Sequence, residues 1–242
     1  MYDGIKLVPP LFEIGLKGYL WGEKAFELAR AADRLSAKYG ITIIFDPQYV
    51  DIPIIARETQ HLLVFAQHMD PVEVGRGVGA VLPEALKAAG AHGVLLNHVE
   101  RRLTLSDIAR NIKRADEVGL CTLVCSDSPA EAAAVAQLLP NMVLAEPPEL
   151  IGTGRSVATE NRAFITESIR LVKKVNPKII VFNSAGIRTA EDVANVIRAG
   201  AEATGTTSGI LKAEDPFRQM EEMIAALKRT WQEIHRGAVA SS

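Results

Sequence analysis

The sequence predicts an α/β protein that folds as a (β/α)8 barrel, a closed sheet of eight parallel strands with helices around it. Short apolar runs alternate with amphipathic helical patterns from one end of the chain to the other, which is the order that gives βαβ units and a parallel sheet. The chain has 242 residues, and barrels of this kind typically take about 250. We therefore expect one domain that spans residues 1–242.

The expected strands are short and rich in apolar residues, as strands buried on both faces are. They lie at residues 11–15, 41–45, 62–66, 93–96, 121–125, 142–145, 179–182 and 203–206. The expected helices lie at 23–38, 83–89, 105–118, 130–138, 162–175, 190–198 and 216–234, each with an Ala- and Leu-rich face opposite a charged face. Residues 50–58, between the second and third strands, show only a weak helical pattern.

An open doubly wound sheet is the alternative arrangement of the same units. Such sheets usually carry a glycine-rich dinucleotide turn after the first strand. Here that turn reads Gly15-Leu16-Lys17-Gly18, which lacks the third glycine and the acidic partner of such a site. The closed barrel is therefore favoured.

Composition and charge exclude several classes of protein. The chain has 27 Lys and Arg against 29 Asp and Glu, a net charge of -2, so that nothing indicates a surface for nucleic acid. No apolar run approaches the roughly 20 residues that span a bilayer, and the first ten residues lack the pattern of a signal peptide. We expect a soluble, cytoplasmic protein without a membrane partner.

The two cysteines, Cys121 and Cys125, lie four residues apart in one apolar run. A disulfide between them is geometrically poor, and no second group of Cys or His completes a metal site. We expect them to be reduced and structural. The histidines outside the predicted strand ends have no companion ligands either and are expected to be structural or exposed, namely His61, His68, His92 and His235. No metal site is predicted.

The end of the sixth strand is the most informative part of the chain. Glu146 follows the apolar run 142–145, and because a buried strand does not tolerate an unpaired charge, the carboxylate should lie where the strand enters a site. Two prolines then stiffen the chain. Gly152 and Gly154 supply a hinge and N–H groups that can approach an anion closely. The segment predicts a base beneath a hinged lid, although a surface ion pair of Glu146 is the plainer alternative.

Two other strand ends carry ionisable side chains. In a barrel of this kind, the functional site is built at the carboxyl ends of the strands. Lys17 follows the first strand, and His98 follows the fourth, with Asn97 and Glu100 beside it. Taken alone, Lys17 is more often a solvated loop residue, and Glu100 is favoured at any helix start. His98 lies directly at a strand end rather than on an apolar face, which favours a functional role.

The seventh and eighth strands are followed by short glycine- and serine-containing turns. These are Ser184-Ala185-Gly186 and Thr207-Ser208-Gly209. Their glycines expose N–H groups at a face of the barrel where helix dipoles point outward. We expect Ser184, Gly186, Ser208 and Gly209, together with Gly152, to bind an anion such as a phosphate.

Together these segments resemble triosephosphate isomerase, and specifically its short archaeal form. The resemblance runs from about residue 11 to residue 224. It rests on Leu16-Lys17-Gly18-Tyr19, on Phe65 to Asp70, on Leu96-Asn97-His98 with Glu100-Arg101, and above all on Ala145 to Gly154. The motif that begins at Ala145 is highly specific, whereas the glycine matches near the end of the chain are weak alone.

The resemblance implies a TIM barrel and an isomerase that interconverts dihydroxyacetone phosphate and glyceraldehyde 3-phosphate without a cofactor or a metal. Glu146 would take the proton next to the carbonyl, His98 would polarise the substrate oxygens, and Lys17 would stabilise the enediolate. The predicted phosphate-binding residues would hold the substrate phosphate. Residues 70–79 resemble the loop through which the family forms dimers, which implies a homodimer or homotetramer.

Three departures from the family pattern lie near the lysine and the histidine. Gly15 stands where the family carries an Asn, Val99 where it carries a Ser, and Val78 where the interface loop offers a Thr. Each change removes a polar group. The sequence therefore predicts a larger and drier pocket at this end.

Two alternatives follow from these departures. One keeps the chemistry but takes a four- or five-carbon ketose phosphate that uses the room at Gly15. The other is a barrel that binds a phosphorylated metabolite without turnover. A barrel lyase or synthase has only fold analogy in its favour.

Overall fold

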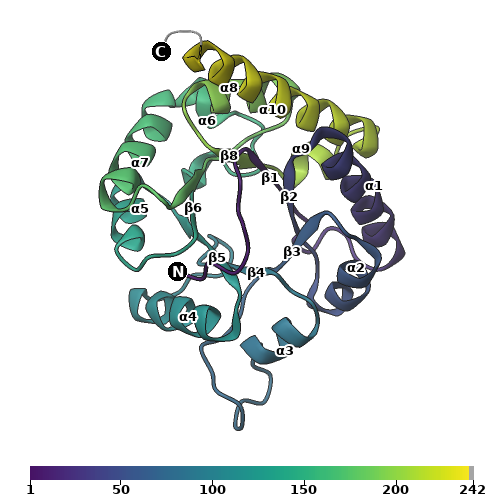
Figure 1. The fold of residues 1–242 in the computed structure, drawn as a ribbon, viewed down its shortest axis with the longest axis vertical. Helices are drawn as coiled ribbons and strands as arrows, with labels where there is room; N and C mark the ends of the chain where they lie inside the picture. Colours follow the sequence, from purple (N-terminus) through teal and green to yellow (C-terminus); the bar gives the residue numbers. More distant parts are fainter. Residues whose placement is uncertain (240–242) are drawn as a thin grey trace.

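The structure, a computed structural model, describes residues 1–239 and shows a closed barrel of parallel strands in chain order (Figure 1). The strands are β1 (Leu11–Gly15), β2 (Thr42–Asp46), β3 (Leu62–Ala66), β4 (Gly93–Leu96), β5 (Cys121–Ser126), β6 (Met142–Ala145), β7 (Ile180–Phe182) and β8 (Ala203–Gly205). Each strand pairs with the next, and β8 pairs with β1 to close the ring. The predicted fold class is confirmed.

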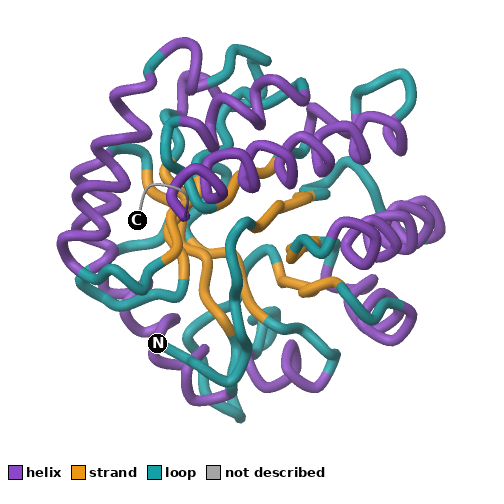
Figure 2. The backbone as a smooth tube through the Cα atoms, turned by 45° about the horizontal axis from the view of Figure 1, so that its top comes forward, coloured by secondary structure: helices purple, strands orange, loops and turns teal. Residues whose placement is uncertain are grey.

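Helices surround the strands on all sides (Figure 2). They are α1 (Glu23–Tyr39), α2 (Ile52–Glu58), α3 (Pro83–Ala88), α4 (Leu105–Val118), α5 (Pro129–Ala136), α6 (Val157–Glu160), α7 (Arg162–Val175), α8 (Ala190–Arg198), α9 (Ser208–Leu211) and α10 (Pro216–Val239). Two 3-10 turns, η1 (Tyr49–Asp51) and η2 (Pro148–Leu150), complete the secondary structure. The sequence did not predict α6, α9 or η2, because a helix of one turn has no periodic pattern to detect.

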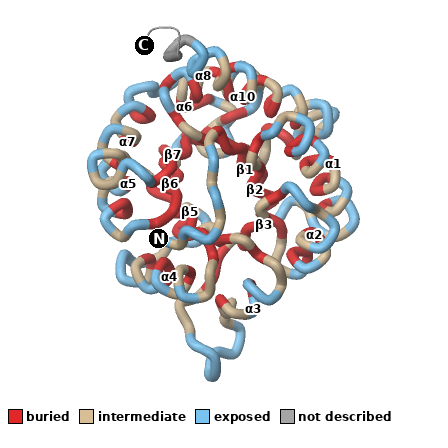
Figure 3. Tube along the Cα trace, in the orientation of Figure 1, coloured by how far each residue is buried: buried red, intermediate tan, exposed pale blue. Residues whose placement is uncertain are grey.

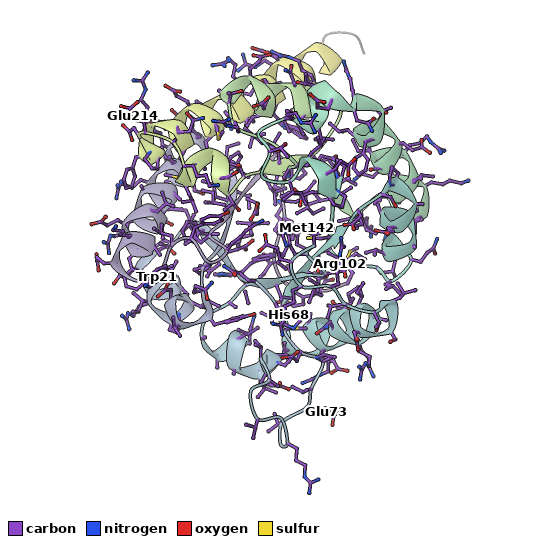
Figure 4. All side chains as sticks on the ribbon, turned by 180° about the vertical axis from the view of Figure 1, so that it is seen from behind. Trp21, His68, Glu73, Arg102, Met142 and Glu214 are labelled. Carbon is purple, nitrogen blue, oxygen red and sulfur yellow. The ribbon has the colours of Figure 1, made fainter. Side chains whose placement is uncertain are left out.

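The barrel has two apolar cores, because successive strand residues point to opposite faces of the sheet. One core lies between the sheet and the helices. The other fills the inside of the barrel with side chains that include Leu11, Ile44, Phe65, Leu123, Met142 and Phe182. The strands are accordingly buried along their length, and Met142 lies at the centre of the molecule (Figures 3 and 4). Cys121 and Cys125 are buried in this inner core as free thiols, as expected.

The first ten residues cross the mouth of the barrel at the amino ends of the strands (Figure 1). Tyr2, Ile5 and Leu7 pack against the inner core from below. The side chain of Asn141, just before β6, donates a hydrogen bond of 2.6 Å to the carbonyl oxygen of Tyr2. The N-terminal segment therefore closes one mouth of the barrel and leaves the carboxyl ends of the strands as the place for a site.

The connection between β3 and α3 projects from the barrel (Figure 1). Its base is closed by Asp70, whose carboxylate accepts a hydrogen bond of 2.7 Å from the backbone of Val81. Farther out, Val74 is 73% exposed and Val78 is fully exposed. Figure 4 shows Glu73 on the same projecting segment. Among the helices described, none has the length and apolar content that a membrane crossing would need.

Candidate active site

A cavity of about 330 Å³ opens at the carboxyl ends of the strands. Lys17, His98 and Glu146 all border it, although they follow three different strands. The structure thus brings together the three ionisable residues that the sequence singled out. The cavity also reaches the loops after β7 and β8, where the sequence predicts an anion site.

Glu146 enters the cavity directly from the end of β6. Its backbone N–H donates a hydrogen bond of 2.9 Å to the carbonyl oxygen of Ser126, so that the chain is still tied to β5 at this residue. Burial, and then the nearby negative charge of Glu13, raises the pKa of the Glu146 carboxyl to about 7. A carboxylate with this pKa is basic enough to take a proton from carbon and is still ionised in part at neutral pH.

Lys17 has a strained backbone, with a φ of 48° in the left-handed region. The carbonyl oxygen of Lys17 accepts hydrogen bonds from the side-chain amides of Gln48 and of Gln67, the latter at 3.0 Å. Because an outlier of this kind costs of order 1–3 kcal/mol, both amides serve to hold the lysine in place. The ammonium group of Lys17 lies 2.6 Å from a carboxylate oxygen of Glu100.

His98 is held as a neutral imidazole with a defined tautomer. The backbone N–H of Glu100 donates a hydrogen bond of 3.1 Å to Nδ1 of His98, so that the proton of the neutral ring lies on Nε2. Burial, and then the positive charge of Lys17, lowers the pKa of His98 to about 4. The ring can therefore donate a hydrogen bond into the cavity at neutral pH without carrying a charge.

Asn97 supports this loop from outside the cavity. Its φ is 59°, and its side chain donates to the carbonyl oxygen of Cys125 at 3.0 Å and accepts from the backbone of Leu103 at 2.9 Å. Glu100, by contrast, borders the cavity and pairs with Lys17. Asn97 thus contacts the backbone around the His98 loop, and Glu100 contacts Lys17.

The far end of the cavity is lined by the predicted anion-binding residues Gly152, Ser184, Gly186 and Ser208. The hydroxyl of Ser184 is buried and has no hydrogen-bond partner among the described residues. Gly209 lies outside the lining, because its N–H donates to the hydroxyl of Thr206 at 3.1 Å. Gly209 therefore supports the turn in this structure, and its N–H does not face the cavity.

The chain passes so close to Gly186 that this position has no room for a side chain. A Cβ atom there would lie 1.8 Å from the carbonyl oxygen of Arg155, and its φ of 74° also favours glycine. The N–H of Val157 donates a hydrogen bond of 3.0 Å to the carbonyl oxygen of Ala185. The segment after Glu146 is thus attached at its far end to the loop after β7.

The segment between Glu146 and Val157, which is attached at both of these residues, has the features of a lid. Pro148–Leu150 forms the 3-10 turn η2, whose Leu150 is buried. Gly152 and Gly154 both have a φ of 74°, in the left-handed region that favours glycine. The rigid turn is thus followed by two positions where the backbone needs glycine. Ile151 and Gly152 border the cavity, which places the segment at its edge.

The floor of the cavity contradicts the expectation of a drier pocket at Gly15. The carboxyl groups of Glu13 on β1 and Asp46 on β2 both border the cavity. A Cβ atom at Gly15 would lie 2.5 Å from Oε1 of Glu13, so that the space left by the missing side chain is filled by a carboxyl group. The sequence contained a signal for this, because Glu13 interrupts the apolar run LFEIG and Asp46 directly follows the expected strand 41–45, but neither is among the residues predicted for the site.

The other two departures lie away from the cavity lining. Val99 is half-buried in the loop after His98, and Val78 is exposed on the projecting loop. His68, which was expected to be structural or exposed, is buried with Nε2 3.1 Å from Asp70 and borders the cavity. Within the described part of the chain, no three His, Cys, Asp or Glu side chains are grouped so that they could hold a metal ion.

Comparison with known proteins gives one consistent result. A family model described as triosephosphate isomerase matches residues 16–226. The chain is 37% identical over 220 residues to the triosephosphate isomerase of Methanobacterium bryantii, a match that covers 90% of this chain and 97% of that protein. It is 39% identical to those of Methanosarcina mazei and Sulfolobus acidocaldarius, over 89% of this chain and 97% and 94% of theirs.

Proposed function

Since the chain belongs to the triosephosphate isomerase family, we propose that Glu146, His98 and Lys17 carry out the interconversion of dihydroxyacetone phosphate and glyceraldehyde 3-phosphate that membership implies. The family is itself the standard example of a carboxylate base that works with a neutral imidazole beneath a closing lid, so that these roles are taken from it. What the structure contributes is the geometry with which this chain can fill them. The reaction would serve glycolysis and gluconeogenesis.

Glu146 starts the reaction by taking a proton from the carbon next to the substrate carbonyl. The electron pair of the broken C–H bond forms an enediolate, and Glu146 returns the proton to the neighbouring carbon. A base with a pKa of about 7 suits both steps, because it accepts and releases a proton with similar ease.

His98 acts on the substrate oxygens during the same steps. The Nε2 proton, fixed by the hydrogen bond at Nδ1, can be donated to the carbonyl oxygen as negative charge develops there. The proton removed from the other oxygen restores the ring. The ammonium group of Lys17 stabilises the enediolate and attracts the phosphate dianion.

The phosphate is held at the other end of the cavity. The free hydroxyl of Ser184 and the backbone at Gly152, Gly186 and Ser208 supply the donors. Closure of the lid, residues 147–154, excludes water, which matters because an exposed enediol phosphate loses its phosphate. Contacts with the phosphate, far from the reacting carbons, thus help to keep water away from the enediolate.

One observation carries this proposal. A single cavity is bordered both by a carboxyl whose pKa is raised to about 7 and by an imidazole whose pKa is lowered to about 4. Such opposite shifts make one group a base and keep the other a neutral donor at the same pH. A site that only binds a phosphorylated metabolite has no use for this pair.

The test is steady-state turnover of both triose phosphates by the wild-type chain and by Glu146→Ala. We expect a kcat/KM of roughly 10⁶ M⁻¹s⁻¹ or above for the wild type and a loss of more than about 10³-fold in the variant. Glu233→Ala, on the exposed surface of α10, serves as the matched control for loss of a carboxylate. A folded wild type without turnover would refute the proposal.

The alternative substrates are not favoured. The relatives that cover almost all of this chain are triosephosphate isomerases. In addition, the room at Gly15, which suggested a four- or five-carbon ketose phosphate, is filled by the carboxyl group of Glu13.

The projecting loop supports a further part of the proposal, assembly into a homodimer or homotetramer. Val74 and Val78 are exposed on a segment that extends away from the barrel, and apolar side chains in such a place are typical of contact surfaces. Light scattering across a range of protein concentrations would give the number of subunits. We also expect the enzyme to act in the cytoplasm without a cofactor, as the family resemblance implies.

A further inference from the structure

Two carboxyl groups lie at the floor of the cavity, side by side on adjacent strands. β1 and β2 pair so that Gly15 lies opposite Asp46, and Glu13 is the previous inward position on β1. Glu13 is 8% exposed and Asp46 is 1% exposed, and both border the cavity. Glu13 is thus the more exposed member of the pair, and Asp46 is the more deeply buried one.

Two glycines form the slot that holds the Glu13 carboxyl. A Cβ atom at Gly15 would lie 2.5 Å from Oε1, and one at Gly205 would lie 2.6 Å from Oε2. Side chains at either position would therefore displace the carboxyl group. Both oxygens of Glu13 occupy space that only glycine leaves free on β1 and β8.

The pair cannot carry two negative charges in this position. Both oxygens of Asp46 are buried, and neither receives a hydrogen bond from any of the described residues. A proton shared between the two carboxyl groups would satisfy Asp46 and relieve the repulsion. Consistent with this, burial and then the charge of Glu13 raise the pKa of Asp46 well above its usual range, and burial raises the pKa of Glu13.

The other groups that face the pair set its electrostatic surroundings. Lys17 from the loop after β1 favours the ionised form of Glu13, whereas the negative charge of Glu146 from β6 opposes it. From the remaining sides come the thiol of Cys125 on β5 and the hydroxyl of Thr207 after β8. The charge of Lys17 alone does not compensate three ionised carboxylates at Glu13, Asp46 and Glu146. The pair of Glu13 and Asp46 therefore keeps one proton.

On the premise of the isomerase activity proposed above, we propose that Glu13 is a further catalytic residue, which shares one proton with Asp46 and hydrogen-bonds the substrate oxygen beside Gly15. When the proton lies on Glu13, the pair donates to a carbonyl oxygen. When it moves to Asp46, Glu13 accepts from a hydroxyl group. The proton passes only between the two carboxyl groups, and none is gained or lost by the pair.

This exchange matches the chemistry of the reaction. Each of the two reacting substrate oxygens is a carbonyl in one triose phosphate and a hydroxyl in the other. A fixed donor would suit one form only, whereas a carboxyl pair with one proton suits both. Asp46, the more deeply buried of the two, is a positioning residue that holds or releases the proton.

The first experiment compares Glu13→Ala with Glu13→Gln. Glu13→Ala removes the proposed hydrogen bond to the substrate oxygen, and we expect kcat/KM to fall by about 30-fold or more. Glutamine should lose far less, because its amide both donates and accepts. Inhibition by inorganic phosphate, which binds at the opposite end of the cavity, should stay within about twofold of the wild type in both variants.

The decisive variant removes the polar side chain at Glu13 and introduces another at Gly15. Glu13→Ala combined with Gly15→Asn places a carboxamide into the vacated slot from the neighbouring inward position, and we expect it to recover at least about tenfold of the lost kcat/KM. Gly15→Asn alone should be impaired, because its Cβ atom meets the Glu13 carboxyl. A purely structural role of Glu13 would give no such rescue.

Asp46→Asn tests the shared proton independently of whether the rescue variant folds. Asparagine donates to Glu13 permanently and leaves it ionised, so that one ionisation should disappear from the pH dependence of kcat/KM. An unchanged profile from pH about 5.5 to about 9 would overturn the proposal, as would a Glu13→Ala variant within about threefold of the wild type. An inactive wild type would refute the isomerase activity instead, so that the two failures are distinguishable.

Discussion

Glu146 and His98 illustrate at the scale of single residues how one cavity moves two pKa values in opposite directions. Burial disfavours the charged form of each group, which means ionised for the carboxyl and protonated for the imidazole. The same removal from water therefore raises the pKa of Glu146 and lowers that of His98. Neighbouring charges, Glu13 for the former and Lys17 for the latter, push each pKa further in the same direction.

The pH dependence of catalysis follows from these shifts. Glu146 must be ionised to act as a base, so kcat/KM should rise with pH up to its pKa of about 7 and then level off until the carboxyl pair of Glu13 and Asp46 loses its shared proton. His98, with a pKa of about 4, should add no ionisation between pH about 5 and about 9. The measurement is a pH profile corrected for the second ionisation of the substrate phosphate, near about 6. A plateau that extends down to pH 5 would contradict the assignment of Glu146.

The raised pKa of Glu146 also has a cost in stability that depends on pH. The folded protein binds this proton more tightly than the unfolded chain, so stability is lost as the pH rises through the folded pKa of about 7. Glu146→Gln should therefore raise the free energy of unfolding by about 2 kcal/mol at pH 8.5, or roughly 5 °C in Tm, and by little at pH 5. Thermal unfolding at both pH values checks this, with Glu233→Gln as a control. An equal effect at both pH values would point to packing instead.

Lys17, His98 and Glu146 could be predicted as a group because each follows an apolar strand directly, where the fold class alone fixes its position. Asp46 directly follows the expected strand 41–45, so that its position offered the same signal and was missed. Glu13 could not be predicted in this way, because it lies within an expected strand and only the structure shows that it borders the cavity. Gln48 and Gln67 are further examples. Their contact with the carbonyl oxygen of Lys17 depends on the backbone of three different loops.

At the scale of elements, the lid and its neighbouring loop depend on glycines of two different kinds. Gly186 lies beneath the chain at Arg155, whereas a Cβ atom at Gly152 would meet nothing within 4 Å. Both have the same φ of 74°, so that the backbone cost of a side chain is matched and only the contact differs. The two positions therefore separate the effect of backbone freedom from that of close packing.

Alanine substitutions at these glycines should have distinct effects. Gly186→Ala must displace the backbone of residues 155–156, and we expect a loss of about 3 kcal/mol in stability and of at least about tenfold in kcat/KM. Gly152→Ala should cost only about 1–2 kcal/mol and lower kcat a few-fold by restricting the lid. Chemical denaturation and steady-state kinetics measure both. Similar losses for the two variants would mean that contact with Arg155 is unimportant.

The elements themselves were predicted to within a few residues. Four strands, β1, β3, β4 and β6, have the expected bounds, and α4, α7 and α8 do as well. The other bounds differ at element ends, where backbone hydrogen bonds rather than the apolar pattern determine the last residue. β5, for example, extends to Ser126, because Ser126 pairs with Ala145 in β6. α10 continues to Val239, past the expected end at residue 234.

At the scale of the whole molecule, the projecting loop is the feature that the barrel itself does not need. Its exposed valines contribute nothing to either core of the single chain. Replacing both with a charged residue should therefore leave the fold intact and act only on assembly.

We expect the double variant Val74→Asp and Val78→Asp to shift the protein toward monomers, because two carboxylates would have to be buried in each contact. The Tm of the variant at low protein concentration should lie within about 2 °C of the wild type. Light scattering gives the mass, and Val50→Asp, an exposed valine in η1 that is 79% accessible, is the matched control. A variant that keeps the mass of the wild type would show that another surface holds the subunits together.

The N-terminal segment has a consequence for the order in which the chain acquires its structure during synthesis. Tyr2 leaves the ribosome before any strand of the barrel, yet its carbonyl oxygen is bound by Asn141, which emerges 139 residues later. The inner core that receives Ile5 and Leu7 likewise exists only once the sheet is closed. The segment that precedes β1 is therefore synthesised before the strands but docks only after the sheet has closed.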